Sequence, residues 1–448
     1  MRKVKVLRVM LLLVLVSEIF DIAPLYSHEF WTPVSLFNWF TAPLPIKFCV
    51  FELSCFLLLV TTRNKRPVAR PVLKAIYVSF GTAMFVTVYG LVTGGSYLPL
   101  YTLLHAWSFG LAFALTAMAV LSNADDFRQL DDAIVLAACW RSAWGIVFYL
   151  KVRNYDWSRL PSWMTTHEDS VLFSVALIVL VSRAIESRSK KSLRNLLLGT
   201  PLILMAMKVN NRRLVWATVI ASLLIIYFSL PATAKVAKRI NRAMRTIAPA
   251  LALYVAIGWS NPTGVFKPLA TLTSMFSGKR ENGEVDLSTK ARDNENFGCV
   301  TMMLERPILG TGFGHEWLEI DKSGTVPLTV FPMYHFSPHN SIMALLAFCG
   351  GLGLAGLWMV IPISIFLNTL VYRRSRDPTE RTVAITGVTT AVAYLNQAYG
   401  DMGFIHPMPS ILLGLSIASA ARLSVTSGVW SRPGTNRART IGNQPSAS

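Results

Sequence analysis

The chain has 448 residues, of which 53% are hydrophobic and only 15% are charged, and its net charge at pH 7 is +19. Because soluble domains average about 25% charged residues, this composition excludes an ordinary soluble domain. The basic excess would suit a nucleic-acid partner in a soluble protein, but here it falls in short segments between apolar runs, as in membrane proteins. The sequence therefore predicts an all-α, polytopic membrane helix bundle that binds no nucleic acid.

About 12 apolar runs have roughly the length of a membrane-spanning helix, 17–25 residues. The first follows a basic N-terminus and is similar to a signal peptide, but no small-residue cleavage site follows it, so we interpret it as a helix. Residues 24–46, with four prolines among aromatic residues, indicate an interfacial segment. The predicted spans are residues 7–23, 47–62, 72–95, 97–122, 133–151, 168–186, 193–209, 213–230, 243–260, 340–371, 382–399 and 403–422.

The basic residues between the runs predict the orientation. Cytoplasmic loops of membrane proteins are enriched in Lys and Arg, and most of the 43 such residues lie on one side if the N-terminus is cytoplasmic. The segment 123–132 is an exception, because its four aspartates accompany a single Arg128. We divide the chain into residues 1–260 with spans one to nine, a large extracytoplasmic loop over 261–339 that carries short helices, spans ten to twelve over 340–424, and a disordered cytoplasmic tail over 425–448.

Two adjacent arginines, Arg212 and Arg213, lie at the outer start of the eighth predicted span in the stretch NNRRLVWATV. One interpretation is a topology anchor whose side chains reach the lipid headgroups. Arginines on the outer face run against the usual charge bias, however, and a guanidinium group presents a planar fork of donors that matches phosphate oxygens. Both arginines are therefore candidate phosphate ligands.

The large loop contains Arg292 and Arg306, which on their own are most simply solvated loop residues. The apolar spacing in CVTMMLERP predicts a short amphipathic helix that ends at Pro307, followed by the glycine pattern GTGFG. This pattern follows no strand, so it fails the context of a dinucleotide site. We expect Gly312 and Gly314 to form a tight turn.

His339 and Asn340 open the tenth predicted span, directly after Pro338. An isolated histidine at such a position is most often a helix-end residue with a satisfied hydrogen bond. The partial positive charge of a helix N-terminus, however, helps to keep an imidazole neutral. A neutral imidazole, with an ordinary pKa of about 6.5, is suited to general-base catalysis. His339 is therefore the candidate base.

Other polar residues in the apolar regions are weaker candidates. Arg141 lies within a predicted span, where charged side chains usually face a cavity or a partner. The run His-Glu-Asp at 167–169 contains metal-binding residue types, but adjacent helical residues point in different directions, so we predict no metal site. Asp401 and His406 occupy an outer turn and are candidates for shaping an acceptor site.

About twelve spans, a large loop after the ninth, NNRRLVWATV and the stretch RPILGTGFG … HNSIMALLAFCGGLGLAGL together resemble the O-antigen ligase/polymerase family of bacterial envelope enzymes. The motifs cover roughly residues 205–360. The resemblance implies that His339 is the base and that Arg292 and one of two adjacent arginines bind a donor diphosphate. This chain has two arginines where one is usual, which leaves open whether Arg212 or Arg213 is the ligand. The supporting residues are Asn340, Arg306, Arg141, Gly312 and Gly314.

The resemblance implies a glycosyltransferase of the bacterial inner membrane whose site faces the periplasm. It would move oligo- or polysaccharide from a polyprenyl (undecaprenyl) diphosphate donor to an acceptor sugar hydroxyl, with inversion and without a metal or other cofactor. A polymerase is favoured over a ligase acting on lipid A-core. The partners implied are the lipid-linked donor, a glycan or lipid-core acceptor, membrane lipids and other polysaccharide assembly proteins. A transporter or flippase of lipid-linked glycans, which predicts broken helices with midplane charges, and a non-catalytic scaffold are the alternatives.

Overall fold

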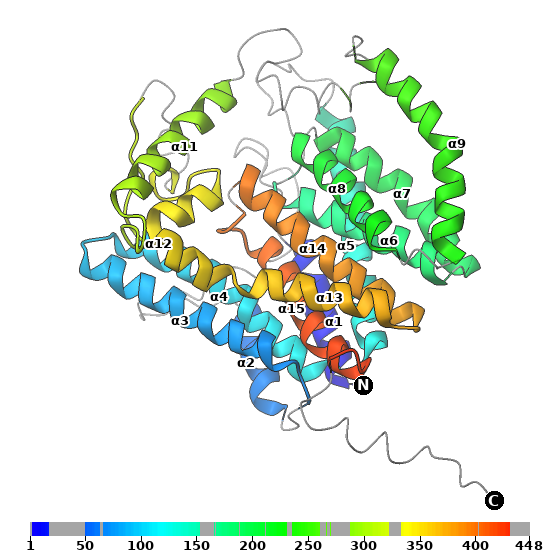
Figure 1. The fold of residues 1–448 in the computed structure, drawn as a ribbon, viewed down its shortest axis with the longest axis horizontal. Helices are drawn as coiled ribbons and strands as arrows, with labels where there is room; N and C mark the ends of the chain where they lie inside the picture. Colours follow the sequence, from blue (N-terminus) through cyan, green and yellow to red (C-terminus); the bar gives the residue numbers. More distant parts are fainter. Residues whose placement is uncertain are drawn as a thin grey trace, which may run out of the picture.

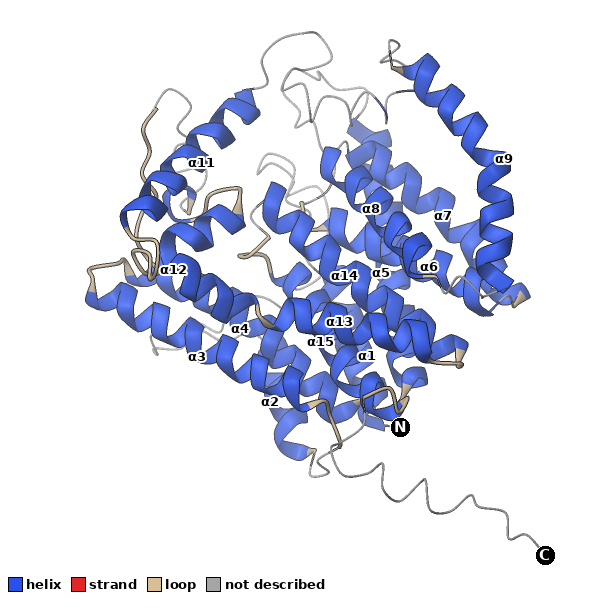
Figure 2. Cartoon of the chain, in the orientation of Figure 1, coloured by secondary structure: helices blue, strands red, loops and turns tan. Residues whose placement is uncertain are grey.

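The computed structural model describes residues 2–17, 50–62, 66–152, 165, 167–187, 189–210, 212–230, 235–259, 266, 269, 287–321, 333–401 and 403–430. All regular structure in these residues is helical, as Figure 2 shows. Seven of the described helices are long and apolar enough to cross a membrane. The structure is therefore that of a membrane-embedded helix bundle, in agreement with the composition. The interfacial segment predicted for residues 24–46 and most of the predicted tail lie outside the described residues.

The described helices overlap all twelve predicted runs. The seven helices with the length and hydropathy of a span are α3, α4, α5, α6, α7, the joined pair α12–α13, and α15. In chain order the elements are α1 (Arg2–Ser17), α2 (Val50–Thr61), α3 (Arg70–Val92), α4 (Tyr97–Val120), α5 (Ala124–Val152), α6 (Asp169–Ser187), α7 (Lys190–Asn210), α8 (Arg213–Ser229), α9 (Lys235–Gly258), α11 (Leu287–Glu305), the short 3₁₀ helix η4 (Tyr334–Phe336), α12 (Ser341–Trp358), α13 (Val360–Arg374), α14 (Pro378–Gly400) and α15 (Pro407–Thr426).

Some predicted boundaries are wrong. Helix α5 begins at Ala124, well before the predicted start at residue 133. Two of the four aspartates that interrupted the apolar run, Asp125 and Asp126, lie in its first turn, where a carboxylate is favoured by the positive end of the helix dipole. The Asn123 side chain accepts a hydrogen bond of 3.0 Å from the backbone N–H of Asp126 and so caps this end. The predicted span 340–371 corresponds to one candidate span, Ser341–Arg374, within which two helices, α12 and α13, meet at Met359.

The bundle is organised around α15. In its most apolar 18-residue stretch, 94% of the residues are buried, the largest share among the seven candidate spans. Helices α4, α13 and α14 pack against it. Figure 1 shows α9 at the margin of the molecule and α11 beside α12 at the opposite margin. Helix α11 includes the segment predicted as a short helix before Pro307 but is longer than predicted, because it has 19 residues, begins at Leu287 and ends at Glu305.

The glycine pattern after α11 forms a turn, as predicted from its sequence. Gly310, Gly312 and Gly314 all have positive φ angles, of 65°, 94° and 89°, which glycine adopts without steric cost. The turn is wedged between α12 and the adjoining ends of α3 and α4. The Gly312 N–H donates to the Phe348 carbonyl at 2.7 Å, and the Gly314 carbonyl accepts from the Ser96 N–H at 2.7 Å.

The same turn fills a break in α12. Gly350 has φ +63° and ψ −176°, which is not helical, and the N–H groups of Gly351 and Leu352 donate to the carbonyls of Pro307 and Ile308 at 2.8 and 3.2 Å. A membrane-embedded helix can break only where its released backbone groups find other partners. The segment after α11 therefore provides the hydrogen bonds that α12 loses at Gly350.

Gly350→Ala is expected to destabilise the protein strongly. A Cβ at this position would overlap the Ile308 carbonyl, and the left-handed conformation adds strain, so the free energy of unfolding should fall by about 2–4 kcal/mol. Gly351→Ala is the matched control, because its nearest contact would be an ordinary 3.6 Å to Pro307 O. Thermal unfolding of the detergent-solubilised variants measures the difference. Equal midpoints for the two variants would contradict this role for Gly350.

Candidate functional site

His339 lies one residue before the N-cap of α12 and pairs with a buried glutamate. Glu295, on α11, is 1% exposed. Its Oε1 and Oε2 atoms lie 2.9 and 3.0 Å from His339 Nδ1, and Oε2 also accepts the His339 backbone N–H at 2.7 Å. A carboxylate accepts hydrogen bonds, so the imidazole carries its proton on Nδ1. The Nε2 lone pair of His339 is then available to accept a proton, as in other carboxylate-oriented histidine bases.

Arg212 belongs to a second chain of polar contacts at the start of α8. Its Nη2 donates to Nε2 of His167 at 2.9 Å, and His167 Nδ1 donates to the carboxylate of Asp401. This arrangement fixes the neutral tautomer of His167, with the proton on Nδ1. Residues from three separate segments of the chain are thereby joined: the entry to α6, the entry to α8 and the turn after α14.

The electrostatics of this chain agree with the tautomer. Burial lowers the pKa of His167, although Asp401 opposes this effect, and the positive charge of Arg212 lowers it further. Burial alone would raise the pKa of Asp401, but His167, then Arg212 and His339, outweigh it and hold the pKa below its usual value. Asp401 is thus ionised at working pH, and its contribution to stability is lost only as the pH falls through this lowered pKa.

Asp401 and Arg212 lie in one region of the molecule and His339 in an adjoining one. The two regions are tied by a hydrogen bond of 3.2 Å from the Phe404 N–H to Ser341 Oγ. A further pair, Glu168 with His406 at 2.5 Å, borders the same turn. We call these three neighbouring groups of residues together the histidine–arginine cluster: His167, Glu168, Arg212, Glu295, His339, Asp401 and His406.

The other two predicted phosphate ligands lie beside this cluster. Arg292 is partly exposed and lies three residues before Glu295 on α11, a spacing that makes the two side chains neighbours on the helix surface. Arg213 is the first residue of α8, is partly exposed and directly follows Arg212. The structure thus distinguishes the adjacent arginines, because Arg212 contacts His167 within the cluster.

Two of the predicted supporting residues, Asn340 and Arg141, make contacts that stabilise the helix bundle. The Asn340 side chain caps α12 by accepting from the backbone N–H groups of Ile342 and Met343 at 3.2 and 3.3 Å. Arg141 is fully buried, and its guanidinium group pairs with both carboxylate oxygens of Asp169, with Nη2 3.1 Å from Oδ2. The intramembrane charge is therefore neutralised by a partner.

The remaining supporting residues lie away from the cluster. Arg306 is exposed and directly follows the end of α11 at Glu305, which lies ten residues after Glu295, about 15 Å along the helix axis at 1.5 Å per residue. Its charge lowers the pKa of His315, which burial lowers more. Gly312 and Gly314 are enclosed by α3 and α4: a Cβ at Gly312 would overlap Gly90, and one at Gly314 would lie 2.6 Å from Ser96 O. These glycines are packing residues of the turn.

The residues at 167–169 diverge, as their adjacency predicted. His167 pairs with Asp401, Glu168 with His406 and Asp169 with Arg141. Across the described residues, no group of three or more His, Cys, Asp and Glu side chains has a geometry that could hold a metal ion. Each of the three side chains therefore pairs with a different residue.

Two residues of the site were missed in the sequence. Glu295 was not singled out, although its spacing of three from Arg292 on a predicted helix was a usable signal. Asn210 at the end of α7 is fully buried, and neither atom of its amide has a hydrogen-bond partner in the described part of the chain. A buried amide in this state is normally satisfied by water or a ligand. Its position two residues before Arg212 makes it a candidate contact for a bound molecule.

Comparison of the chain with protein-family models gives no match, and no curated protein matches it.

Proposed function

We propose that the protein is a membrane glycosyltransferase that moves oligo- or polysaccharide from a polyprenyl diphosphate donor to an acceptor sugar hydroxyl. We further propose that it acts as a polymerase of exopolysaccharide or O-antigen type, with a ligase onto lipid A-core as the alternative. The observations that carry the proposal are the contacts of Arg212 with His167 and of His167 with Asp401, and the hydrogen bond from Phe404, three residues after Asp401, to Ser341, two residues after His339.

The chemistry requires two positive groups and one base. A diphosphate is a good leaving group when cations offset the charge that develops on its oxygens. The guanidinium groups of Arg212 and Arg292 take this role, since their planar forks match phosphate oxygens. Asn210, an uncharged residue close in sequence to Arg212, is then available to orient the sugar.

The transfer step follows from the tautomer of His339. The acceptor oxygen attacks the anomeric carbon of the donor sugar, and the bond from that carbon to the diphosphate oxygen breaks. The acceptor proton moves to Nε2 of His339, and the Glu295 carboxylate stabilises the resulting imidazolium through its contact with Nδ1. The electron pair of the broken bond leaves with the diphosphate. Attack opposite the leaving group inverts the anomeric configuration.

The position of the cluster suits a lipid-borne donor. We propose twelve spans, the N-terminus and the basic segments on the cytoplasmic side, and the loop with α11 on the periplasmic side of a bacterial inner membrane, as the positive-inside rule favours. The cluster, at the start of α8 and α12, then faces the outer leaflet. The donor would enter from the membrane and the acceptor from water.

A transporter of the same lipids has weaker support. It predicts broken helices with charged groups at the bilayer midplane. Helix α12 does break at Gly350, but the turn after α11 satisfies its backbone groups, and the buried charge of Arg141 is neutralised by Asp169. The glycosyltransferase proposal uses residues that the transporter proposal leaves without a role.

The proposal is tested with purified protein in lipid nanodiscs and a polyprenyl-diphosphate oligosaccharide. We expect glycan transfer and release of polyprenyl diphosphate in the presence of EDTA, because the two arginines offset the leaving-group charge. Mass spectrometry of the lipid and gel analysis of the glycan measure both products. If EDTA stops the reaction and Mg²⁺ or Zn²⁺ restores it, the metal-independent mechanism is wrong. If no glycan forms in nanodiscs, but the protein in sealed proteoliposomes moves lipid-linked sugar across the membrane, the protein is a transporter.

A further inference from the structure

A small polar cavity lies at the opposite end of α5 and α6 from the cluster. It is bordered by α5, α14 and α15, is partly open, has a volume of about 10 Å³, and is lined on its polar side by Asp131, Thr386, Thr390, Ser416 and Ser419. This volume is close to the minimum that holds one water-sized particle. The other lining residues from α14 and α15 are uncharged.

Two of the lining polar atoms have no hydrogen-bond partner in the described part of the chain. They are Oδ2 of Asp131 and Oγ1 of Thr386, from residues that are 2% and 4% exposed. Both are oxygen atoms, and Oδ2 of Asp131 belongs to a carboxylate, which carries a negative charge when it is ionised. Buried polar atoms are almost always satisfied. The two oxygens therefore belong to residues that line the same cavity and can accept a further contact.

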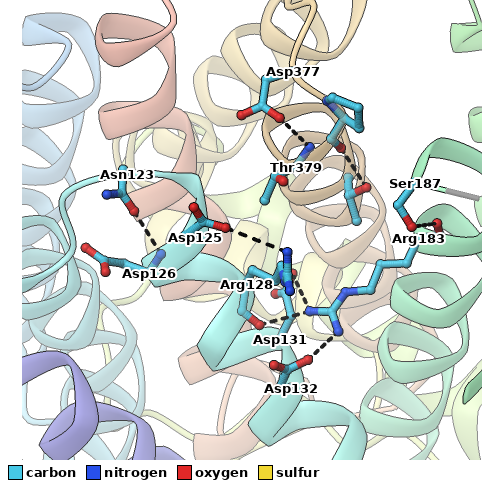
Figure 3. Close-up of polar contacts among 12 residues, drawn as sticks. Asn123, Asp125, Asp126, Arg128, Asp131, Asp132, Arg183, Ser187, Asp377 and Thr379 are labelled. Carbon is cyan, nitrogen blue, oxygen red and sulfur yellow. Dashed lines mark hydrogen bonds and ion pairs between the residues drawn. The ribbon is translucent and has the colours of Figure 1, made fainter. Parts of the chain in front are cut away.

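The charges around Asp131 do not balance. Figure 3 shows Arg183 extending from α6 toward α5, where its guanidinium group contacts Asp132 and the Arg128 carbonyl, the latter at 2.9 Å. The nearest approach of Arg183 to Asp131 is 3.7 Å, from Nη2 to Oδ2, which is an ion-pair distance without a hydrogen bond. One guanidinium group thus faces two carboxylates.

Arg128 does not correct this imbalance. Its side chain is about half exposed and lies 3.7 Å from Asp125, which is 75% exposed. Asp132 is 42% exposed and can be solvated, whereas Asp131 is 3% exposed by its side chain. The uncompensated negative charge therefore falls on the buried carboxylate, which is costly in a membrane-embedded bundle unless a positive species joins it.

We propose that this cavity binds one sodium ion. Hard cations take oxygen ligands from carboxylates, hydroxyls and carbonyls, and the cavity offers the Asp131 carboxylate and the Thr386 hydroxyl as open ligands. A single positive charge neutralises the group of Arg183, Asp131 and Asp132, whereas a divalent ion would leave an excess. A proton on Asp131 would neutralise the same charge, and the salt dependence of stability separates the two cases.

Sodium in this cavity would join three helices. Asp131 is on α5, Thr386 on α14 and Ser416 on α15, and a ligand that binds only the folded state stabilises it in proportion to its concentration over Kd. The inference is independent of the transferase proposal, since the cavity shares no residue with the histidine–arginine cluster.

The test is direct binding of ²²Na⁺ to the purified protein, together with thermal unfolding in NaCl, KCl or choline chloride at equal ionic strength. We expect saturable binding of one ion per chain and a rise in the unfolding midpoint of about 5 °C at saturating Na⁺. Asp131→Asn should abolish both effects, and Thr386→Val should weaken Na⁺ binding about tenfold. Asp125→Asn, on the same helix but exposed, is the matched control and should bind as the wild type does.

Three results would overturn the proposal. They are no saturable ²²Na⁺ binding, stabilisation that is equal in all three salts, and stability that follows pH alone, which would assign the positive charge to a proton on Asp131. The charged groups that face this carboxyl are Arg183 and Asp132. If Asp131→Asn does not fold, the Na⁺ affinity of Thr386→Val decides between the two outcomes.

Discussion

His339→Ala should lower the rate of glycan transfer by about 10²–10⁴-fold, the usual contribution of a general base. The loss should fall on kcat, because Nε2 accepts a proton only as the acceptor attacks, whereas KM for the donor should change little while Arg212 and Arg292 remain. Initial rates at several donor concentrations, followed by release of polyprenyl diphosphate, measure the two parameters.

His335→Ala is the matched control. His335 lies four residues earlier, on η4, where it stacks on Trp317 with ring centroids 6.1 Å apart. We expect this variant to transfer glycan at a rate close to wild type. A rate for His339→Ala within about threefold of wild type would remove His339 from the mechanism and favour a transporter or a scaffold.

A companion variant tests the partner of the base. Glu295→Gln keeps the size of the side chain but removes the negative charge that stabilises the imidazolium, so kcat should fall by about 10²-fold or more. Glu305→Gln, at the exposed end of the same helix, should have no comparable effect. Equal activities of the two variants would mean that Glu295 only holds α11 against α12.

Arg212→Lys should lower kcat/KM for the donor by about 10–100-fold although the positive charge is kept. An ammonium group cannot reproduce the planar fork, and the contact of 2.9 Å with His167 would also be lost. Steady-state kinetics with the lipid-linked donor measure the loss. Arg292→Lys is expected to behave in the same way.

Arg213→Lys is the control for this prediction, because the two arginines are adjacent and equally charged. We expect a smaller effect, since the contact with His167 belongs to Arg212. If Arg213→Lys were the more impaired variant, Arg213 would be the phosphate ligand and Arg212 would serve only to orient His167. Equal, near wild-type activity of both variants would contradict diphosphate binding at this end of α8.

Features that depend on local sequence were predictable. Hydropathy located the helices, the spacing of apolar residues located α11, and the glycines at 310–314 predicted the turn. The start of α5 was predicted wrongly. Aspartates lower the mean hydropathy and so indicate a loop, whereas the helix dipole favours them in a first turn. The number of spans and the resemblance to the O-antigen ligase/polymerase family stay predictions.

Pairings between distant residues were not predictable from one sequence. Glu295 and His339 are 44 residues apart, and His167 and Asp401 are 234 apart. No local rule specifies such contacts, which arise from the packing of α6, α8, α11, α12 and α14. Arg141 is a further example: its intramembrane charge suggested a functional residue, but its role in the structure depends on Asp169, which no nearby pattern indicated.

The most direct test is an experimental structure of the protein with polyprenyl diphosphate bound in a nanodisc. The account predicts diphosphate oxygens within about 3 Å of the guanidinium groups of Arg212 and Arg292, with Nε2 of His339 facing the position of the anomeric carbon. A diphosphate bound at the other end of the bundle, or one that contacts neither arginine, would contradict the account.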